Sequence, residues 1–354
     1  HIPMSFDPGP LDPTVNIINI EEGAILDDDQ LIQIESQDAN YVEVKLDGAT
    51  RHISGGGNFE FTTNTEDLSY GTHQLTAFAR RDNQRVMADI KLVWNIPDVV
   101  EESIPPWYNL GVHDQLDGTV SFSILAPGKK FISLVGEFNE WDPVAGLMKY
   151  DPAQGIFWLN FPLGPGEYEY LYIIDGDKVV GDPLATDVNW TDMFGNEHWA
   201  SENQRSVASI GQDDFPWTDD EWVKPNMKDL IIYEMLLRDF TDSGDLAGLM
   251  SKMDYLEDLG VNAIELMPPT EFPGETSWGY NPAFFMAFES SYGTPDDFRE
   301  FVDEAHARGM AVLIDLVFNH ADGSSPYQQM YGNDYENSPY MHAEGNEWGF
   351  PDFD

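Results

Sequence analysis

The sequence of 354 residues contains no cysteine and few basic residues. Without cysteine the chain has no disulfide and no thiolate metal site, and its composition leaves the redox compartment open. Lys and Arg number 17 against 64 Asp and Glu, so the formal net charge is −47. Because binding to a phosphate backbone needs a basic surface, this balance excludes duplex DNA or RNA as a partner.

Long apolar runs are also missing. No run approaches the roughly 20 residues that a membrane-spanning helix needs, so we expect no membrane span. The hydrophobic fraction of 42% is ordinary for a globular protein. The length leaves room for two or three domains, each with an adequate core.

The first part of the chain predicts an all-β domain. Residues 1–14 are rich in proline and aspartate and indicate an extended lead-in. Over residues 15–98, short strand-like runs recur with turn signals between them, at 15–20, 31–34, 41–46, 59–61, 73–78 and 86–92. This spacing predicts an antiparallel β-sandwich. Tyr70-Gly71-Thr72, just before a late strand, resembles the tyrosine corner of immunoglobulin-like (E-set) domains, so we expect a spacer or docking module.

A second all-β module is predicted over residues 107–212, after a linker that contains Pro97, Pro105 and Pro106. Its characteristic residues are the segment 135–143, Trp158, the segment 165–170, Asp175-Gly176 and Asp182-Pro183. This series resembles carbohydrate-binding module family 48, a β-sandwich that precedes the catalytic barrel in branching, debranching and related enzymes. The resemblance extends from about Gly111 to Ser206.

Two tryptophans of this module, Trp141 and Trp158, are candidate sugar-binding residues. Sugars present flat faces of C–H bonds, which stack on exposed aromatic rings beside polar groups. The alternative is that one or both rings fill the sandwich core, as large aromatic residues in short strands usually do.

Residues 226–354 predict alternating strands and helices. Residues 230–235 and 263–267 read as strands, and apolar residues at steps of three and four between Leu246 and Leu259 predict an amphipathic helix that Gly260 ends. Thr294 and Pro295 supply the N-cap and first residue of a second helix.

The apolar run 311–318 then predicts a strand covered on both faces, although periodicity alone does not exclude a buried helix. This order of elements predicts a parallel sheet and the first part of an (α/β)8 TIM barrel. We therefore expect a multidomain chain, with two all-β sandwiches followed by the first part of the barrel.

The polar residues of this last part fall at the ends of predicted strands, where TIM barrels place their chemistry. These ends carry Glu265, the loop 277–282 and Asn319-His320. Residues 315–320, with the sequence DLVFNH, resemble the first short motif of the α-amylase superfamily, glycoside hydrolase family 13. The sequence WGY at 278–280 resembles the tyrosine loop of its branching-enzyme and related members.

The resemblance implies a role for each of four residues. Tyr280 stacks on the sugar at the cleavage subsite, His320 hydrogen-bonds the hydroxyls of that sugar, Asp315 orients a downstream arginine, and Asn319 binds or neighbours a structural calcium. Taken singly, each residue is better explained structurally: Asp315 as a strand-end cap, Asn319-His320 as the start of a turn and Tyr280 as a core aromatic. Their order after the appropriate elements favours the functional interpretation.

The resemblance also implies a retaining mechanism, in which two carboxyl groups about 5 Å apart act as nucleophile and as acid then base. In the family these carboxylates follow the fourth and fifth strands, with a further aspartate after the seventh. The sequence ends at Asp354, soon after the third predicted strand. We therefore expect no catalytic residue in this chain and no hydrolysis by it alone.

The leading interpretation is the N-terminal portion of a glycoside hydrolase that acts on an α-glucan polysaccharide or oligosaccharide of the starch or glycogen type. A branching-type glucan transferase is the alternative within this class. An alternative of another class is a non-catalytic α-glucan-binding protein, and glucan binding by the first sandwich is also open. Because three barrel strands leave an exposed sheet edge, we favour a truncated chain over a natural end.

Calcium is the one cofactor that the resemblance implies, and it implies no organic cofactor. Asn319 lies near Asp322, Asp334 and Asp352, whose oxygens suit a cation with six to eight oxygen ligands. The alternative is that Asn319 satisfies backbone groups at a turn. Aromatic residues beyond His320 either line a sugar cleft or pack within a loop; they are Tyr327, Tyr331, Tyr335, Tyr340, Trp348 and Phe350.

Acidic residues occur in every region of the chain, which indicates a solvated acidic surface and adaptation to high salt. Because salt screens repulsion between like charges, we expect the melting temperature to rise as salt increases well beyond ~0.15 M. Thermal unfolding in dilute buffer and in molar salt measures this, and equal melting temperatures would contradict it.

Overall fold

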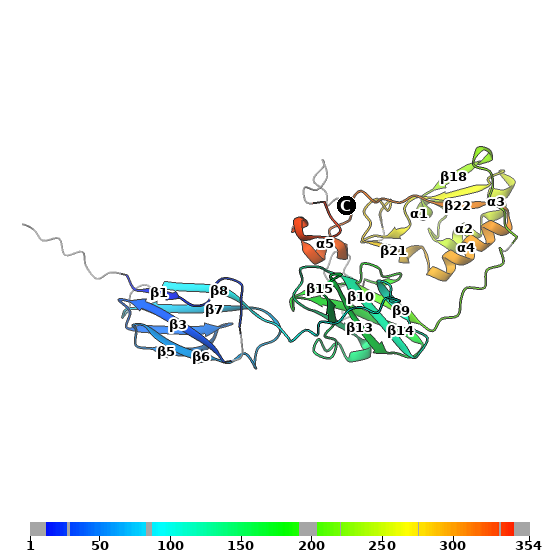
Figure 1. Ribbon diagram of the computed structural model, residues 1–354. Helices are drawn as coiled ribbons and strands as arrows, with labels where there is room; N and C mark the ends of the chain where they lie inside the picture. Colours follow the sequence, from blue (N-terminus) through cyan, green and yellow to red (C-terminus); the bar gives the residue numbers. More distant parts are fainter. Residues whose placement is uncertain are drawn as a thin grey trace, which may run out of the picture. The chain divides into compact units, whose positions relative to one another are not determined.

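Figure 1 shows the computed structural model of the chain, which describes residues 12–26, 29–82, 87–190, 204–219, 221–274, 276–332 and 334–342. The chain forms two compact units. The first unit consists of the chain up to Asp98 together with the turn Asp175–Asp177. The second unit consists of Val99–Ile174 and the chain from Lys178 onward. Among the helices of the described residues, none is long and apolar enough to cross a membrane.

The first unit is a β-sandwich of two sheets. One sheet has the order β1-β3-β6 and the other β2-β8-β7-β4-β5, and among the described strands of this unit only β2 and β8 pair in parallel. The strands are β1 (Thr14–Ile17), β2 (Ala24–Ile25), β3 (Gln30–Gln37), β4 (Tyr41–Leu46), β5 (Ala49–Ser54), β6 (Phe59–Thr63), β7 (Gly71–Arg80) and β8 (Met87–Asn95). Alternate side chains point into the core, as in β4, where Val42, Val44 and Leu46 are fully buried.

The predicted strands of this region overlap β1, β3, β4, β6, β7 and β8. Strands β2 and β5 were not predicted. Strand β2 has only two residues, and β5 has the largely polar sequence ATRHIS, which lacks an apolar alternation. Both form because they pair with a neighbour, β2 with β8 and β5 with β4.

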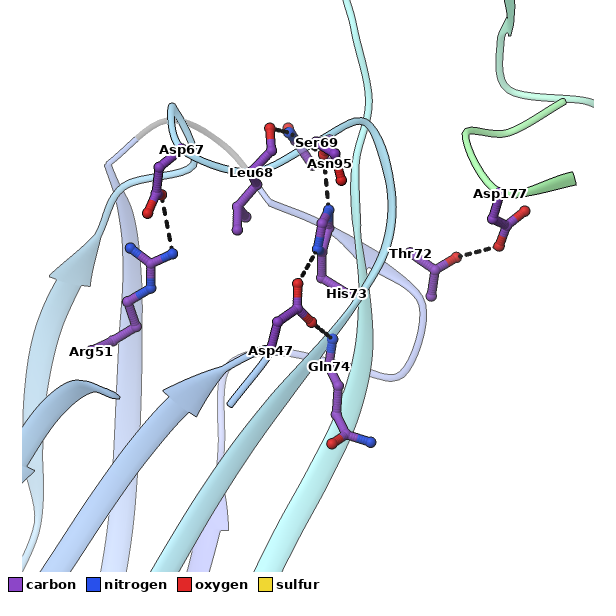
Figure 2. A network of polar contacts seen from close by, with 10 residues as sticks. All are labelled: Asp47, Arg51, Asp67, Leu68, Ser69, Thr72, His73, Gln74, Asn95 and Asp177. Atoms are coloured by element: carbon purple, nitrogen blue, oxygen red, sulfur yellow. Dashed lines mark hydrogen bonds and ion pairs between the residues drawn. The ribbon is translucent and has the colours of Figure 1, made fainter. Parts of the chain in front are cut away.

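A polar network surrounds His73 on β7 (Figure 2). The ring is 5% exposed, with Nδ1 2.5 Å from Asp47 Oδ2 and Nε2 2.9 Å from the Ser69 carbonyl oxygen. The buried ring thus bridges two acceptors, the Asp47 carboxylate and the Ser69 carbonyl. Burial acts to raise the pKa of Asp47, but hydrogen bonds from the Gln74 amide and from His73 outweigh it and lower the pKa.

We expect Asp47→Ala to lower the free energy of unfolding of the first unit by about 1 kcal/mol at neutral pH, because it removes the acceptor of the buried His73 ring, while the 47% exposure of the Asp47 side chain reduces the cost. Since the folded-state pKa of Asp47 is lowered, this stabilisation is present above the ordinary value of 3.8 and is lost as the pH falls through the folded-state value. Urea unfolding at neutral and acidic pH measures it.

Asp67→Ala is the control, since Asp67 is 65% exposed and its ion pair with Arg51 lies at the surface. An equal loss in the two variants, or a loss for Asp47→Ala that does not change with pH, would contradict the pairing.

The second unit contains another β-sandwich. Its sheets have the orders β12-β13-β10-β9 and β11-β14-β17-β16, and β15 also pairs with β14. The elements are β9 (Gly111–Asp114), β10 (Thr119–Leu125), β11 (Ile132–Gly136), η1 (Glu137–Asn139), β12 (Lys149–Asp151), β13 (Ile156–Pro162), β14 (Gly166–Ile174), β15 (Lys178–Val180), β16 (Val188–Asn189) and β17 (Arg205–Ile210). Buried aromatic residues dominate the core, among them Phe122, Phe157, Tyr170 and Tyr172.

The remainder of this unit is an α/β layer. Strands β18 (Ile232–Met235), β19 (Ala263–Leu266) and β22 (Ala311–Ile314) form a parallel sheet in that order. Helices α2 (Leu246–Met250), α3 (Met253–Asp258) and α4 (Pro295–Ala307) cover one face, with α4 running along the sheet in Figure 1. The other elements are η2 (Met227–Asp229), α1 (Leu237–Phe240), the hairpin of β20 (Thr270–Glu271) and β21 (Phe284–Phe288), η3 (Ser290–Tyr292), α5 (Pro326–Tyr331) and η4 (Tyr335–Asn337).

The parallel strands and the helices of this layer follow the order that the sequence predicted, which is compatible with part of a TIM barrel, but the β20–β21 hairpin lies where only a loop was predicted. The second predicted helix is confirmed as α4, with Thr294 accepting a hydrogen bond from the Asp297 amide at its N-terminus. The first is broken into α2 and α3 around Ser251. Gly248 weakens the helix there, and the Ser251 hydroxyl donates to the Gly248 carbonyl at 2.6 Å, so it competes with the helical hydrogen bonds.

The prediction that residues 311–318 form a strand covered on both faces is wrong. Strand β22 ends at Ile314, and the side chains of Ile314, Leu316 and Phe318 are 43%, 42% and 64% exposed. Among the described strands β22 pairs only with β19. Strand β19 stops before Pro268, so the pairing ends with the bond from the Asp315 amide to the Leu266 carbonyl.

The aromatic residues after His320 pack on one another and on the second sandwich. The rings of Tyr327 and Tyr340 are 4.7 Å apart. The Tyr331 and Tyr340 hydroxyls donate to the Pro127 and Leu125 carbonyls at 2.8 and 2.6 Å. Tyr327, Tyr331 and Tyr340 therefore fill a packing contact, and a role of Tyr335 in a sugar cleft stays a prediction. Trp348 and Phe350 lie outside the described residues.

Candidate functional site

Tyr280, Asp315 and His320 come together beyond the carboxyl ends of the parallel strands. The Tyr280 hydroxyl donates to Asp315 Oδ2 at 2.8 Å, and His320 Nε2 lies 2.8 Å from the Tyr280 carbonyl oxygen. Because a carbonyl only accepts, His320 Nε2 carries a hydrogen. The three predicted residues thus form one connected cluster, although they lie up to 40 positions apart in the chain.

The backbone of the WGY loop depends on Gly279. Its φ is +85°, and a Cβ atom there would lie 2.0 Å from the Pro268 carbonyl oxygen, so the position requires glycine. The Gly279 amide donates to Ser277 Oγ at 2.9 Å, and Arg238 Nη1 donates to the Ser277 carbonyl at 3.1 Å. These contacts fix Tyr280 between Asp315 and His320.

The Tyr280 hydroxyl lies in a negatively charged environment. Its hydrogen bond to Asp315, followed by burial and by the negative charges of Asp315, Glu234 and Glu265, raises the pKa of Tyr280 to about 12. Glu234 and Glu265 are register partners on β18 and β19, so both lie on the sheet face opposite the helices. Glu265 was expected at this rim from the sequence, whereas Glu234, one residue before the end of the predicted strand 230–235, was not.

The two candidate tryptophans of the second sandwich differ. Trp158 is 4% exposed, and its Nε1 donates to the Glu102 carbonyl at 3.0 Å. It packs with Ile104 and Ile156 in a small core. Trp158 is therefore a core residue and is not exposed for stacking on a sugar. Trp141 is half-buried, and its role in sugar binding stays a prediction.

The described residues do not form a calcium shell around Asn319. Asp322 Oδ1 accepts from the Ser324 amide and hydroxyl, Asp334 binds the Asn337 amide group, and Asp352 lies outside the described residues. No group of three His, Cys, Asp or Glu side chains suited to a metal ion occurs in the described part of the chain. Asn319 is exposed, and calcium binding there stays a prediction.

A separate hollow of about 530 Å³ opens on the second sandwich. Its walls include the carboxylates of Glu137, Glu167, Glu169 and Asp187, and Ser290 comes from the α/β layer. It contains none of the clustered residues Tyr280, Asp315 and His320, so it is distinct from the candidate site.

We expect Asp315→Asn to lower the pKa of Tyr280 toward its ordinary value of 10, because the mutation removes the charged acceptor. The raised pKa means that the Tyr280–Asp315 bond stabilises the fold below pH 10, and that this stabilisation is lost as the pH rises through about 12. Alkaline absorbance titration, with Tyr280→Phe subtracted, measures the pKa. The exposed Asp242→Asn is the control, and an unchanged titration in Asp315→Asn would contradict the bond.

Parts of this chain are similar to known proteins of one family. Residues 237–346 match the family model described as alpha amylase, catalytic domain. A malto-oligosyltrehalose trehalohydrolase of Saccharolobus solfataricus is 36% identical over 183 residues, which cover 52% of this chain and 30% of that protein. The 1,4-alpha-glucan branching enzyme GlgB of Mycobacterium tuberculosis is 31% identical over 264 residues, covering 70% of this chain and 35% of the enzyme.

The fold of this chain is also similar to that of a solved structure. The putative alpha amylase from Salmonella typhimurium aligns with a TM-score of 0.57 at 28% identity, covering 69% of this chain and 38% of that one. The chain spans about a third of the length of the curated relatives that it matches.

Proposed function

The chain carries part of the catalytic domain of the α-amylase superfamily, and on this premise we propose that it is the N-terminal portion of an α-glucan-active glycoside hydrolase. The substrate is of the starch or glycogen type, and the parallel strands are the first three of a TIM barrel. The observation that supports this most is the hydrogen-bonded cluster of Tyr280, Asp315 and His320 at the carboxyl ends of the strands.

In this proposal the cluster positions a sugar ring. The Tyr280 side chain is 39% exposed, so part of its ring is open to the C–H face of a glucose unit. Asp315 holds the hydroxyl of Tyr280, which fixes the direction of the ring. His320 uses Nε2 on the Tyr280 carbonyl and its Nδ1 is buried, so here it supports the loop, and a direct bond to a sugar hydroxyl requires the imidazole to turn.

The retaining chemistry of the whole enzyme needs a nucleophile and an acid–base pair, and we assign neither role to a residue of this chain. The described cluster provides positioning and a defined electrostatic environment. We therefore propose that the 354-residue chain alone binds α-glucan and does not release reducing sugar.

A branching-type glucan transferase is the second candidate. The similarity to a 1,4-alpha-glucan branching enzyme over 70% of this chain and the WGY loop both favour it. Hydrolase and transferase differ in whether water or a sugar hydroxyl accepts the glucan, and the cluster serves both reactions. A non-catalytic α-glucan-binding protein remains the candidate of another class.

Binding of maltoheptaose, measured by calorimetry, tests the site. We expect Tyr280→Ala to weaken binding about tenfold, or about 1.4 kcal/mol, through loss of ring contact. Tyr280→Phe keeps the ring and loses the bond to Asp315, so its effect should be smaller. The control is Tyr255→Ala, which removes a 53% exposed tyrosine from α3.

A matched β-linked glucose oligosaccharide should not compete for the site. Equal affinity in the wild type and in Tyr280→Ala would exclude Tyr280 from the binding site. Release of reducing sugar by the pure chain, surviving both Asp315→Asn and His320→Ala, would contradict the assignment of the site.

A further inference from the structure

The second sandwich packs directly against the β20–β21 hairpin. The contact is apolar and buried, with Ala185, Val188 and Trp190 on the sandwich side and Ala283, Phe284 and Ala287 on the hairpin side. The rings of Trp190 and Phe284 meet edge to face, with centroids 6.0 Å apart. A Cβ atom at Gly181 would lie 3.0 Å from the Phe284 ring and 2.8 Å from the Gln204 carbonyl, so glycine permits the close approach.

Two glutamates lie inside this contact, each 1% exposed. Glu271, at the end of β20, accepts from Trp190 Nε1 at 2.6 Å and from the Ser290 amide at 2.8 Å. Glu289, just after β21, accepts from the Ser291 hydroxyl at 2.6 Å and from the Phe272 amide at 3.2 Å. Trp190 is therefore a direct polar link from the sandwich to the base of the hairpin.

The same hairpin carries the WGY loop. Residues 272–283 connect β20 to β21 and include Tyr280, and the Ala283 amide donates to the Glu271 carbonyl at 2.9 Å, which closes the loop at its base. The position of Glu271 thus influences the direction in which the loop leaves the sheet. The sandwich, through Trp190, acts at that point.

The charge of Glu271 is unfavourable in this environment. No ion pair joins Glu271 to a basic side chain among the described residues. Burial, and next the negative charge of Glu289, raise the pKa of Glu271 well above its ordinary value of 4.5, although the bonds from Trp190 and Ser290 oppose this. A protonated carboxyl retains an oxygen that accepts the Trp190 bond and adds a hydrogen that a carboxylate can accept.

We propose that Glu271 holds a proton when the second sandwich is docked, and that Glu271 and Trp190 are positioning residues that set the loop bearing Tyr280. The docking does not depend on the proposed function, whereas the benefit to substrate binding rests on it. When Glu271 loses its proton, a second negative charge appears beside Glu289 in a buried contact. The docking therefore weakens as the pH rises.

Other charged groups face this contact. Tyr292 lies beside Glu289, and its pKa is raised to about 12 by burial and then by that charge, while Arg238 opposes the shift and Asp239 adds to it. From the sandwich, the hollow brings the carboxylates of Glu137, Glu167, Glu169 and Asp187 toward Ser290, and Arg205 pairs with Glu169. Because burial also raises the pKa of Asp187, a comparison with a variant at position 271 is needed to isolate Glu271.

Hydrogen exchange of the full chain without sugar tests the proposal. The readout is the exchange rate of amides in residues 270–290, corrected for its intrinsic pH dependence, with amides of the first unit as an internal reference. If opening releases one proton, the wild-type rate rises about tenfold per pH unit from about pH 5 toward the raised pKa of Glu271. We expect Glu271→Gln, which cannot ionise, to lose this slope while keeping most of the protection at low pH.

Two further variants complete the design. Glu300→Gln changes an exposed glutamate of α4 and should keep the wild-type slope. Trp190→Phe keeps an aromatic ring and removes the donor, so exchange at residues 270–290 should be faster at every pH. In difference infrared spectra at neutral pH, the carbonyl band of a protonated carboxyl should be lost in Glu271→Gln and retained in Glu300→Gln.

A wild-type slope in Glu271→Gln would overturn the proposal. So would equal loss of protection in Glu271→Gln and Glu271→Ala at all pH values, since that would mean that the ionised form holds the contact. If the proton-linked slope is found and maltoheptaose does not bind, the docking stands and the proposed function fails. If maltoheptaose binds and the proton-linked slope is absent, the proposed function stands and the proton-linked docking fails.

Discussion

The parallel pairing of β18, β19 and β22 is the constraint on which the candidate site depends. Parallel strands in register bring their carboxyl ends to one edge, so the residues that follow them meet there. Glu234 and Glu265 lie side by side in this register, and Asp315 continues from β22 through its amide bond to the Leu266 carbonyl. The WGY loop, inserted between β19 and β22 in the chain, then needs only to fold back over this edge to place Tyr280 on Asp315.

The second sandwich supports both segments that flank this edge. It contacts the WGY hairpin through Trp190 and the segment after His320 through the hydroxyls of Tyr331 and Tyr340. Figure 1 shows α5 of that segment beside β15 of the sandwich. A module that resembles a sugar-binding domain is thus also a structural support for the rim, and buried area with hydrogen bonds, not exposed aromatic residues, makes this contact.

Charge differs sharply between the surface and the interior. With 64 acidic residues, the chain places most of its carboxylates in solvent, where salt screens them. The few buried ones are bound by donors: Asp182 by the Tyr170 and Tyr172 hydroxyls, and Glu271 by Trp190 and Ser290. Burial raises the pKa of both, so their ionisation is linked to the packing around them.

The sequence alone determined the order of elements and the chemistry at the strand ends. Caps, periodicity and the DLVFNH and WGY motifs are local, so Thr294, Gly279 and the cluster of Tyr280, Asp315 and His320 could be identified from residues close in the chain. Only the tertiary structure decided which residues are covered. Trp158 is buried by residues from a distant segment, and β22 is partly exposed because among the described strands it has one neighbour.

The link from Trp190 to Glu271 had no signal in the sequence at all. These residues lie 81 positions apart in parts of the chain that were read as separate domains. Local patterns report how a segment pairs and buries its own faces. They carry no information on which distant surface packs against it, because that contact forms only when both partners are already folded.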